Sequence, residues 1–245
     1  MVEAQAVESK AAPQLCKNKK CCGKYVFFAK KANSEEKELL PLKKVDIKTE
    51  IRGSFAVINV ELRYVNPYVY SPLECTYVFP VEKTTILAKF EALIDNRVIA
   101  TKVMEKEKAK EKFDDAIASG HAAVIAKKED TTMSVSLGNL LPGQEAVLKQ
   151  SIICQLEVVG GSFAYNLPSA FYPDYRRHGV RDPADFSYEF NYEVRLIAEG
   201  SHISSLSLPQ SAEVVEQNEK KDNILIRSTQ AIQKFDLFFK TADMF

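Results

Sequence analysis

Strict alternation between apolar and polar residues is the feature that most constrains the fold of this chain. It is clearest around residue 190, where the polar positions carry Asp, Ser, Glu, Asn and Arg. The alternating apolar residues are Phe186, Tyr188, Phe190, Tyr192, Val194 and Leu196. Successive side chains of a β-strand point to opposite faces of a sheet, so this pattern predicts a strand with one buried and one exposed face.

The same period of two recurs along most of the chain. Further strands are predicted over 45–51, 56–64, 75–81, 90–94, 98–103, 121–126, 133–137, 146–158, 163–168, 203–208, 224–227 and 235–239. Turn-forming residues separate several of them, at Gly53, Asp95-Asn96, Pro142-Gly143 and Gly160-Gly161. Short turns join antiparallel strands. The sequence therefore predicts a mainly β protein with the architecture of an antiparallel β-sandwich.

One segment departs from this period and predicts a helix. Residues 105–119 are rich in strong helix formers, and Gly120 follows where a left-handed cap is expected. The apolar stripe is narrow: Ala109, Phe113, Ala116 and Ile117. Lysines in this segment alternate with glutamates at distances that allow pairing along a helix. We therefore expect one surface α-helix with a solvated face and not a nucleic-acid contact.

Charge and composition exclude several classes of protein. Lysine plus arginine equals aspartate plus glutamate, at 33 each, so no net field attracts nucleic acid. No segment has the ~18 uninterrupted apolar residues of a membrane span, and the first residues lack the apolar core of a signal peptide. Five cysteines, an odd number, fit reduced thiols better than a disulfide framework. We expect a cytoplasmic protein with no transmembrane segment.

Residues 1–38 are predicted to form a flexible N-terminal extension, because they are polar and lack a sustained period. This extension contains Cys16, Cys21 and Cys22 among four lysines. Three close thiols suggest zinc, but the adjacent Cys21 and Cys22 lack the usual two-residue gap, so no metal or cofactor is expected. Reversible lipidation of these thiols, with the lysines attracted to anionic headgroups, remains an alternative.

No set of residues identifies an active site. The histidines, His121, His178 and His202, are scattered, and no HExxH, GxSxG, P-loop or GxGxxG motif is present. Cys75 stands alone in a predicted strand, as core cysteines commonly do. The chain is therefore expected not to be an enzyme. An enzyme with an unrecognised acid/base site remains an alternative, because such sites often lack local signatures.

A basic loop is the candidate contact site. Between the predicted strands at 163–168 and 186–196, the sequence YPDYRRHGVRDPADF places arginines beside tyrosines. The candidate partner-binding residues are Tyr172, Tyr175, Arg176, Arg177 and Arg181. Arginine and tyrosine are enriched at protein interfaces, where they supply bidentate contacts and large rigid area. A solvated connection without a binding role is the alternative.

Six sequence motifs, in order, carry a resemblance to a known family. They are PLKKVDI, YVFP, KFEALIDNRVI, AIASGHAAVI, SLGNLLPGQ and FAYNLPSAFYPDY. Together they resemble the VIT domain, the vault protein and inter-alpha-trypsin domain, over about 39–175. The likeness is greater to the intracellular von Willebrand factor A domain-containing protein 5A group and to vault poly(ADP-ribose) polymerase than to the secreted inhibitor heavy chains.

The chain departs from the family pattern in two respects. Thr131 and Met133 stand where the family usually has an acidic and an aromatic residue. Relatives normally continue into a von Willebrand A domain with a DxSxS metal site, and this chain has no such motif. The resemblance therefore implies no bound magnesium here.

These observations predict an extension over 1–38, a VIT domain over 39–175, and a basic loop with further strands over 176–245. The expected function is a non-enzymatic protein–protein interaction or scaffold module, with other proteins of a larger assembly as partners. A peripheral membrane protein, anchored by the cysteine- and lysine-containing extension, is the alternative.

Overall fold

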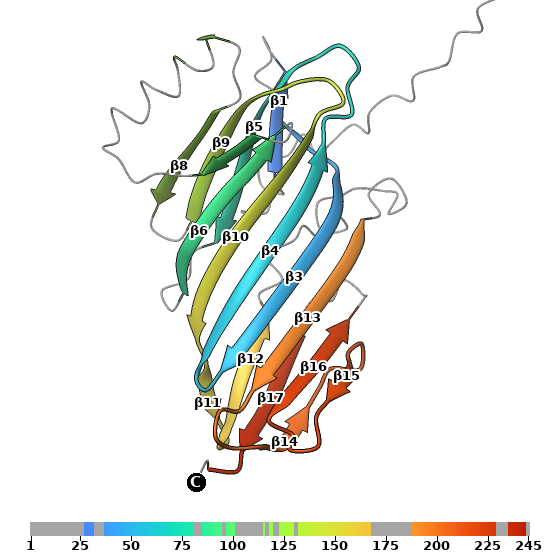
Figure 1. Ribbon diagram of the computed structural model, residues 1–245. Coiled ribbons are helices and arrows are strands. Elements are labelled where there is room, and N and C mark those ends of the chain that lie inside the picture. The colour runs from blue at the N-terminus through green and yellow to red at the C-terminus, as the bar shows by residue number, and fades with distance from the viewer. Residues whose placement is uncertain are drawn as a thin grey trace, which may run out of the picture.

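The computed structural model shows an elongated molecule built from β-strands (Figure 1). The structure describes residues 27–31, 37–80, 85–94, 97–100, 115, 118–119, 123–129, 132–167, 188–228 and 235–243. The strands within these ranges form three sheets, of eight, five and four strands.

The eight-stranded sheet runs the length of the molecule, in the order β15-β16-β13-β3-β4-β10-β6-β7 (Figure 1). In that order its strands are Glu213–Gln217, Asn223–Ser228, Glu189–Ile197, Leu42–Arg52, Phe55–Val65, Glu145–Gln155, Thr85–Ile94 and Arg97–Ala100. Its neighbouring strands pair antiparallel except β13 and β3, which are parallel.

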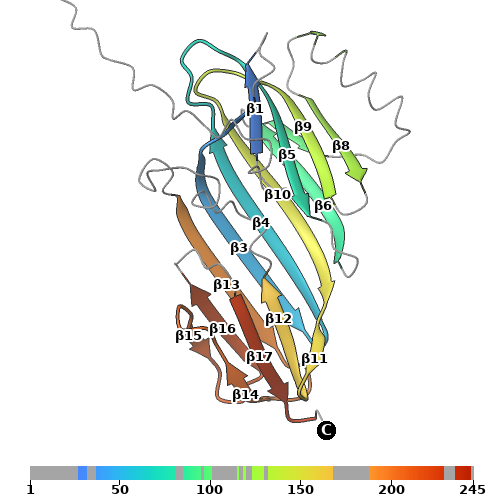
Figure 2. The ribbon, with the colours of Figure 1, turned by 180° about the vertical axis from the view of Figure 1, so that it is seen from behind.

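Two smaller sheets lie on one side of the long sheet, each over one half of it (Figure 2). The five-stranded sheet, β2-β1-β5-β9-β8, comprises Lys37–Leu39, Phe27–Lys31, Leu73–Pro80, Thr132–Leu140 and Ala123–Glu129. The four-stranded sheet, β11-β12-β17-β14, comprises Glu157–Val159, Ser162–Leu167, Phe235–Thr241 and Ile203–Ser207. The architecture is thus two sandwiches that share one long sheet.

Residue alternation explains why the long sheet has one buried face. Along β3 and β4 the buried positions are the apolar ones predicted from the sequence, such as Val45 and Ile58 at 0% and 1% exposure. The two strands form a hairpin in which Arg52 pairs with Phe55. Gly53 lies in the connecting turn with a φ of 55°, a conformation that glycine adopts without steric cost.

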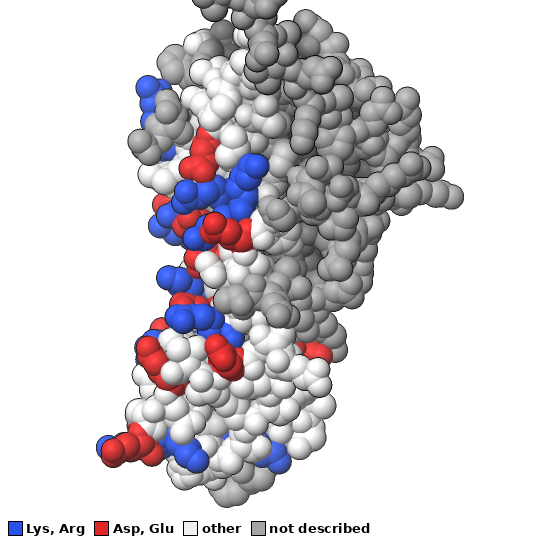
Figure 3. Space-filling model, turned by 90° about the vertical axis from the view of Figure 1, so that its right-hand side faces the viewer, with Lys and Arg blue, Asp and Glu red and all other residues white. Residues whose placement is uncertain are grey.

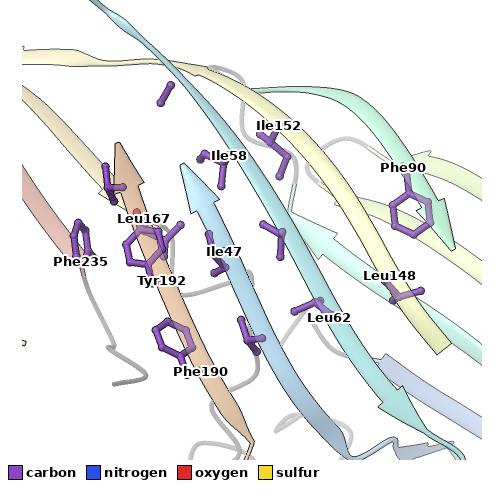
Figure 4. Close-up of a cluster of buried hydrophobic side chains, with 14 of the residues drawn as sticks. Ile47, Ile58, Leu62, Phe90, Leu148, Ile152, Leu167, Phe190, Tyr192 and Phe235 are labelled. Carbon is purple, nitrogen blue, oxygen red and sulfur yellow. The ribbon is translucent and has the colours of Figure 1, made fainter. Parts of the chain in front are cut away.

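A continuous cluster of buried side chains joins the three sheets (Figure 4). Between the eight- and five-stranded sheets, Tyr77 stacks on Phe90 with ring centroids 6.3 Å apart. Between the eight- and four-stranded sheets, the Tyr192 and Phe235 rings meet edge to face at 4.6 Å. Fully burying such a side chain stabilises the fold by about 1.5–3 kcal/mol.

The structure confirms the predicted mainly β, antiparallel sandwich. The predicted helix at 105–119 falls largely outside the described residues. At its end, the Ser119 amide donates to the Asp115 carbonyl at 3.0 Å, which is the spacing of a helical turn.

The prediction that regular structure begins near residue 39 is wrong. Strands β1 and β2 lie within the segment expected to be a flexible extension, and β1 pairs with both β2 and β5. The apolar run at 25–28 is too short for a period of two to stand out, so no strand was predicted there. Residues 1–26 lie outside the described part of the chain, and the predicted domain boundaries at 39 and 175 stay predictions.

Candidate binding face

The solvent-exposed side of the eight-stranded sheet carries rows of charged side chains. In one row, Asp46 of β3 lies opposite Glu61 of β4, and Lys149 of β10 lies between Glu61 and Glu91 of β6. The next row is Lys48, Asn59, Ser151 and Lys89. We call these eight residues the charged face. Figure 3 shows lysine and arginine interleaved with aspartate and glutamate along this side of the molecule.

The charged face is hollowed. Its side chains line a shallow depression of about 330 Å³. The lining residues are the eight of the charged face together with Val60 and Gln150, whose own side chains are buried on the inner side of the sheet. Both signs of charge therefore meet in one concave area of a sheet whose backbone is held by hydrogen bonds to neighbouring strands.

Two ion pairs lie within the charged face, and two of its charged residues have no ion-pair partner in the described part of the chain. Lys149 Nζ lies 3.2 Å from Glu61 Oε2, and Lys89 Nζ lies 2.9 Å from Glu91 Oε1. Asp46 and Lys48 form no ion pair with any described residue. Since like charges directly opposite in a sheet repel, Asp46 beside Glu61 favours a cationic partner. Exposed pairs of this kind contribute only about 0–1 kcal/mol each, so they bias orientation more than stability.

An apolar strip borders the charged face. Val57 lies opposite Ile153, and Ile153 lies opposite Ile86, so the three side chains cross β4, β10 and β6 on the solvent side. Phe55 is two residues from Val57 on the same face of β4. Phe55 and Ile86 are 53% and 66% exposed. We call Phe55, Val57, Ile86 and Ile153 the apolar strip.

The charges continue onto the other half of the same face. Arg227 of β16 donates from Nε and Nη2 to Glu193 Oε1 of β13, at 3.0 and 2.6 Å. Arg52 at the end of β3 bonds to Glu50 and Glu199, and these hydrogen bonds raise the pKa of Arg52 above its usual value. The arginines of this half are therefore already engaged within the chain.

The shifted titratable groups in the core are structural. Burial raises the pKa of the Cys75 thiol to about 12, so it stays protonated at neutral pH, as expected for a core cysteine. Burial also raises the pKa values of Tyr77 and Tyr165 above their usual value. Neutral, buried groups of this kind are not exposed to a substrate.

The residues selected from the sequence are not brought together by the described structure. Tyr172, Tyr175, Arg176, Arg177 and Arg181 lie in 168–187, outside the described residues. The same holds for Cys16, Cys21 and Cys22. In the described ranges, no group of three or more His, Cys, Asp or Glu side chains is placed to hold a metal ion. No helix within those ranges is long and apolar enough to cross a membrane.

Sequence reasoning missed the charged face, although its signal was present. The polar positions of 44–52, 59–63, 89–91 and 145–155 were used only to infer strands. Which of those positions would become neighbours depends on strand order, because β10 lies between β4 and β6 in the sheet but follows both in the chain.

The fold and this face together define a β-sandwich domain that presents a rigid sheet surface to solvent. Residues 42–151 match the Vault protein inter-alpha-trypsin domain, or VIT domain, so this segment is a VIT domain and the sequence-based resemblance is confirmed. The mouse von Willebrand factor A domain-containing protein 5A is 30% identical over 147 residues, covering 58% of this chain and 18% of that relative.

Other relatives share the same segment. A von Willebrand factor A domain-containing protein of Dictyostelium discoideum is 31% identical over 180 residues, covering 73% of this chain and 18% of the relative. Human protein mono-ADP-ribosyltransferase PARP4 is 30% identical over 136 residues, covering 55% and 8%. This chain therefore spans less than a fifth of the length of these relatives.

Among solved structures, the chain is similar in part to Legionella pneumophila aminopeptidase A in complex with aspartic acid. The TM-score is 0.46 at 12% identity, with 86% of this chain and 22% of that chain covered.

Proposed function

We propose that this chain is a non-enzymatic protein–protein interaction module that works as a scaffold within a larger cytoplasmic assembly. The observation that carries the proposal is the apolar strip lying beside the charged face on one side of the eight-stranded sheet. The partner is another protein whose surface offers an apolar patch bordered by charges of both signs.

The arrangement matches the anatomy of a protein interface. Such interfaces have an apolar centre and a polar rim. Exposed apolar residues scattered singly are normal on protein surfaces and need no explanation. Here Val57, Ile153 and Ile86 are consecutive across three strands, and Phe55 adds an aromatic side chain next to them. Contiguity is the feature that favours binding.

The size of the surface indicates what a partner must cover. Three strand spacings of about 4.8 Å separate β3 from β6, about 14 Å in all. The strip and the charged face extend from residue 55 to 61 along β4, about 20 Å at 3.3 Å per residue. This is a fraction of the roughly 800 Å² that each partner contributes to a stable interface. The partner is therefore expected to reach onto β13 as well.

The rigidity of the sheet also supports a binding role. β3, β4 and β10 each have a hydrogen-bonded neighbour on both sides, and the inner face packs on a continuous core. A surface that is already ordered loses little conformational entropy on binding, which leaves more of the contact energy as affinity.

The relatives are consistent with a module inside a larger protein. The matched segment makes up 18% of the mouse von Willebrand factor A domain-containing protein 5A and 8% of human PARP4. The ADP-ribosyltransferase named in the latter belongs to that protein and is no part of the function proposed for this chain.

The basic loop remains a second proposed contact, on sequence grounds. We propose that Tyr172, Tyr175, Arg176, Arg177 and Arg181 add bidentate and aromatic contacts to the same partner. Reversing the charge at the three arginines should reduce the binding of native partners in a pull-down. Retention of every partner by that variant would remove these residues from the proposal.

The test of the module uses a partner purified together with the chain from its native source and identified by mass spectrometry. Its affinity for the wild-type chain is compared by calorimetry with that for the double variant Phe55→Glu and Ile86→Glu. Both positions are more than half exposed, so the fold should survive and circular dichroism should be unchanged. We expect affinity to fall at least tenfold.

Val158→Glu is the matched control. Val158 is 58% exposed on β11 of the four-stranded sheet, whereas Phe55 and Ile86 lie on β4 and β6 of the eight-stranded sheet. This variant should bind as the wild type does. Equal affinity of the wild type and the double variant for each purified partner would refute the proposed binding face.

A further inference from the structure

Two loops meet at one end of the molecule and present an apolar, uncharged tip. The β4–β5 loop, residues 66–72, and the β9–β10 turn, residues 141–144, lie side by side in both ribbon views (Figures 1 and 2). Tyr70, Val69 and Leu141 are 92%, 71% and 47% exposed. We call these three residues the loop tip.

Asn66 fastens the two loops together. It is 1% exposed, and its Nδ2 donates to the Ser71 carbonyl at 3.0 Å and to the Leu140 carbonyl at 2.9 Å. Its Oδ1 accepts from the Tyr68 amide at 3.0 Å. The Asn66 amide also donates to the Gln144 carbonyl at 3.0 Å. The loop tip is therefore held in position before any partner arrives.

Hydrogen bonds also hold the β9–β10 turn in position. Gln144 Oε1 accepts from the Leu141 amide at 2.9 Å, and the Gly143 amide donates to the Asn66 carbonyl at 3.2 Å. Gly143 has a φ of 71°, as expected from the Pro-Gly sequence of the turn. These bonds fix Leu141 next to the longer loop.

The absence of charge sets the chemistry of a partner. Neither 65–73 nor 132–144 contains a charged residue, in a chain of which 27% is charged. A convex, neutral tip carrying tyrosine, valine and leucine fits a concave, neutral, apolar pocket. Tyrosine suits such a contact because it supplies large rigid area and a hydroxyl that can reach a polar group at the pocket wall.

The expected binding strength favours a protein pocket over a lipid surface as the partner of the loop tip. A whole myristoyl chain gives only marginal membrane binding, with an association constant of about 10⁴ M⁻¹. Three side chains bury less apolar area than that chain, and no lysine or arginine in either loop adds attraction to anionic lipid. By contrast, an anchor residue seated in a protein pocket commonly dominates an interface.

We propose that the loop tip inserts Tyr70, flanked by Val69 and Leu141, into a neutral apolar pocket of a separate protein. The C-terminal strand β17 ends at the opposite end of the molecule (Figure 1). The charged face lies on the solvent side of the eight-stranded sheet, on β3, β4, β10 and β6. The loop tip is thus a second surface, distinct from the one proposed above.

The test begins with photocrosslinking from the tip. Tyr70→benzoylphenylalanine is introduced into the chain in its native source, the crosslinked protein is identified by mass spectrometry, and that protein is purified. Its affinity is then measured for the wild type, for Tyr70→Ser with Leu141→Ser, and for Val158→Ser. We expect at least a tenfold loss for the tip variant and none for Val158→Ser. These substitutions are at exposed positions, so folding should be retained.

Two results would show that the loop tip binds something other than a pocket of a separate protein, and either would overturn the inference. They are flotation of the wild-type chain, but not the tip variant, with phosphatidylcholine vesicles, and tip-dependent self-association in sedimentation. Unchanged affinity of the tip variant for the purified protein would overturn it too. The variant Phe55→Glu with Ile86→Glu, measured against the same protein, separates the two surfaces, because it weakens binding only if the sheet face contributes.

Discussion

Gln150 Nε2 donates a hydrogen bond to the Tyr77 hydroxyl, 3.2 Å away, across the interface between the eight- and five-stranded sheets. Both residues are buried, at 4% and 3% exposure. Gln150 is the one polar residue on the inward face of β10, and its Oε1 has no hydrogen-bond partner among the described residues. The bond to Tyr77 therefore compensates only part of the cost of burying this amide.

Tyr77→Phe should destabilise the protein more than the loss of one hydroxyl suggests. The substitution removes the acceptor of the Gln150 amide and leaves a buried donor unsatisfied, at a cost of about 1–3 kcal/mol in unfolding free energy. Adding Gln150→Leu removes the stranded amide, so the double variant should be more stable than Tyr77→Phe. Urea denaturation of the single and double variants measures this coupling. A double variant as unstable as the sum of the two singles would contradict it.

Tyr165 should be the most sensitive hydroxyl in the other sandwich. The Tyr192 hydroxyl donates to the Tyr165 hydroxyl at 2.9 Å, and Thr49 Oγ1 lies 3.0 Å from the same oxygen. Tyr165→Phe removes two of these bonds and Tyr192→Phe removes one. At about 0.5–1.5 kcal/mol per bond, Tyr165→Phe should cost about twice as much. Equal losses of unfolding free energy in Tyr165→Phe and Tyr192→Phe would show that Tyr165 does not link the other two hydroxyls.

Alternation predicted the strands of this fold but not their arrangement. The buried positions of β3, β4 and β13 are those read from the sequence, because a period of two places side chains on one face whatever the neighbours are. The parallel pairing of β13 with β3 was not predicted, since it joins strands separated by more than a hundred residues. Short strands such as β11, with three residues, carry too little pattern to be recognised.

The candidate binding surfaces could not be predicted from the sequence for the same reason, since they depend on how the strands are arranged. Asp46, Lys149 and Glu91 come from three distant segments, and only the strand order brings them into one row. The loop tip is similar, because Asn66 reaches the Leu140 carbonyl, 74 residues further along the chain. The turn at Pro142-Gly143 could be predicted locally, but its contact with the β4–β5 loop could not.

Cys75 should make the protein less stable in alkali. Its thiol pKa is raised from 9.0 to about 12 in the folded protein, chiefly because burial disfavours the thiolate. Below pH 9 the thiol is protonated in both states, so the contribution to stability is fully present. Above pH 9 only the unfolded chain releases the proton, and unfolding free energy should fall by up to about 1.4 kcal/mol per pH unit.

The window between pH 9 and 10 isolates this group best, because the raised pKa values of Tyr77 and Tyr165 add the same sign of effect above about pH 10. Denaturation curves of wild type and Cys75→Ala are compared at pH 8, 9 and 10. The variant should be less stable at pH 8, and the difference should narrow toward pH 10. A constant difference would exclude the thiol as the cause.

Lys221→Gly should stabilise the turn between β15 and β16. Lys221 has a φ of 52°, and it is the one non-glycine residue with positive φ among the described residues. A left-handed conformation costs a residue with a Cβ about 1–2 kcal/mol, whereas the extra unfolded-state entropy of glycine costs about 0.5–1 kcal/mol. The variant should therefore gain up to about 1 kcal/mol, seen as a higher denaturation midpoint.

Gly143→Ala is the control for the effect of backbone conformation, because it makes the reverse change and adds a side chain at a residue with positive φ. Its φ is 71°, and a Cβ added there meets no atom within 4 Å, so any loss comes from conformation and not from a clash. This variant should be destabilised by about 1 kcal/mol.

The Lys221 amide donates to the Asn218 carbonyl at 3.0 Å, and its carbonyl accepts from the Ile203 amide at 2.8 Å. Because glycine keeps both bonds, a loss of stability in Lys221→Gly would mean that the lysine side chain itself supports the turn.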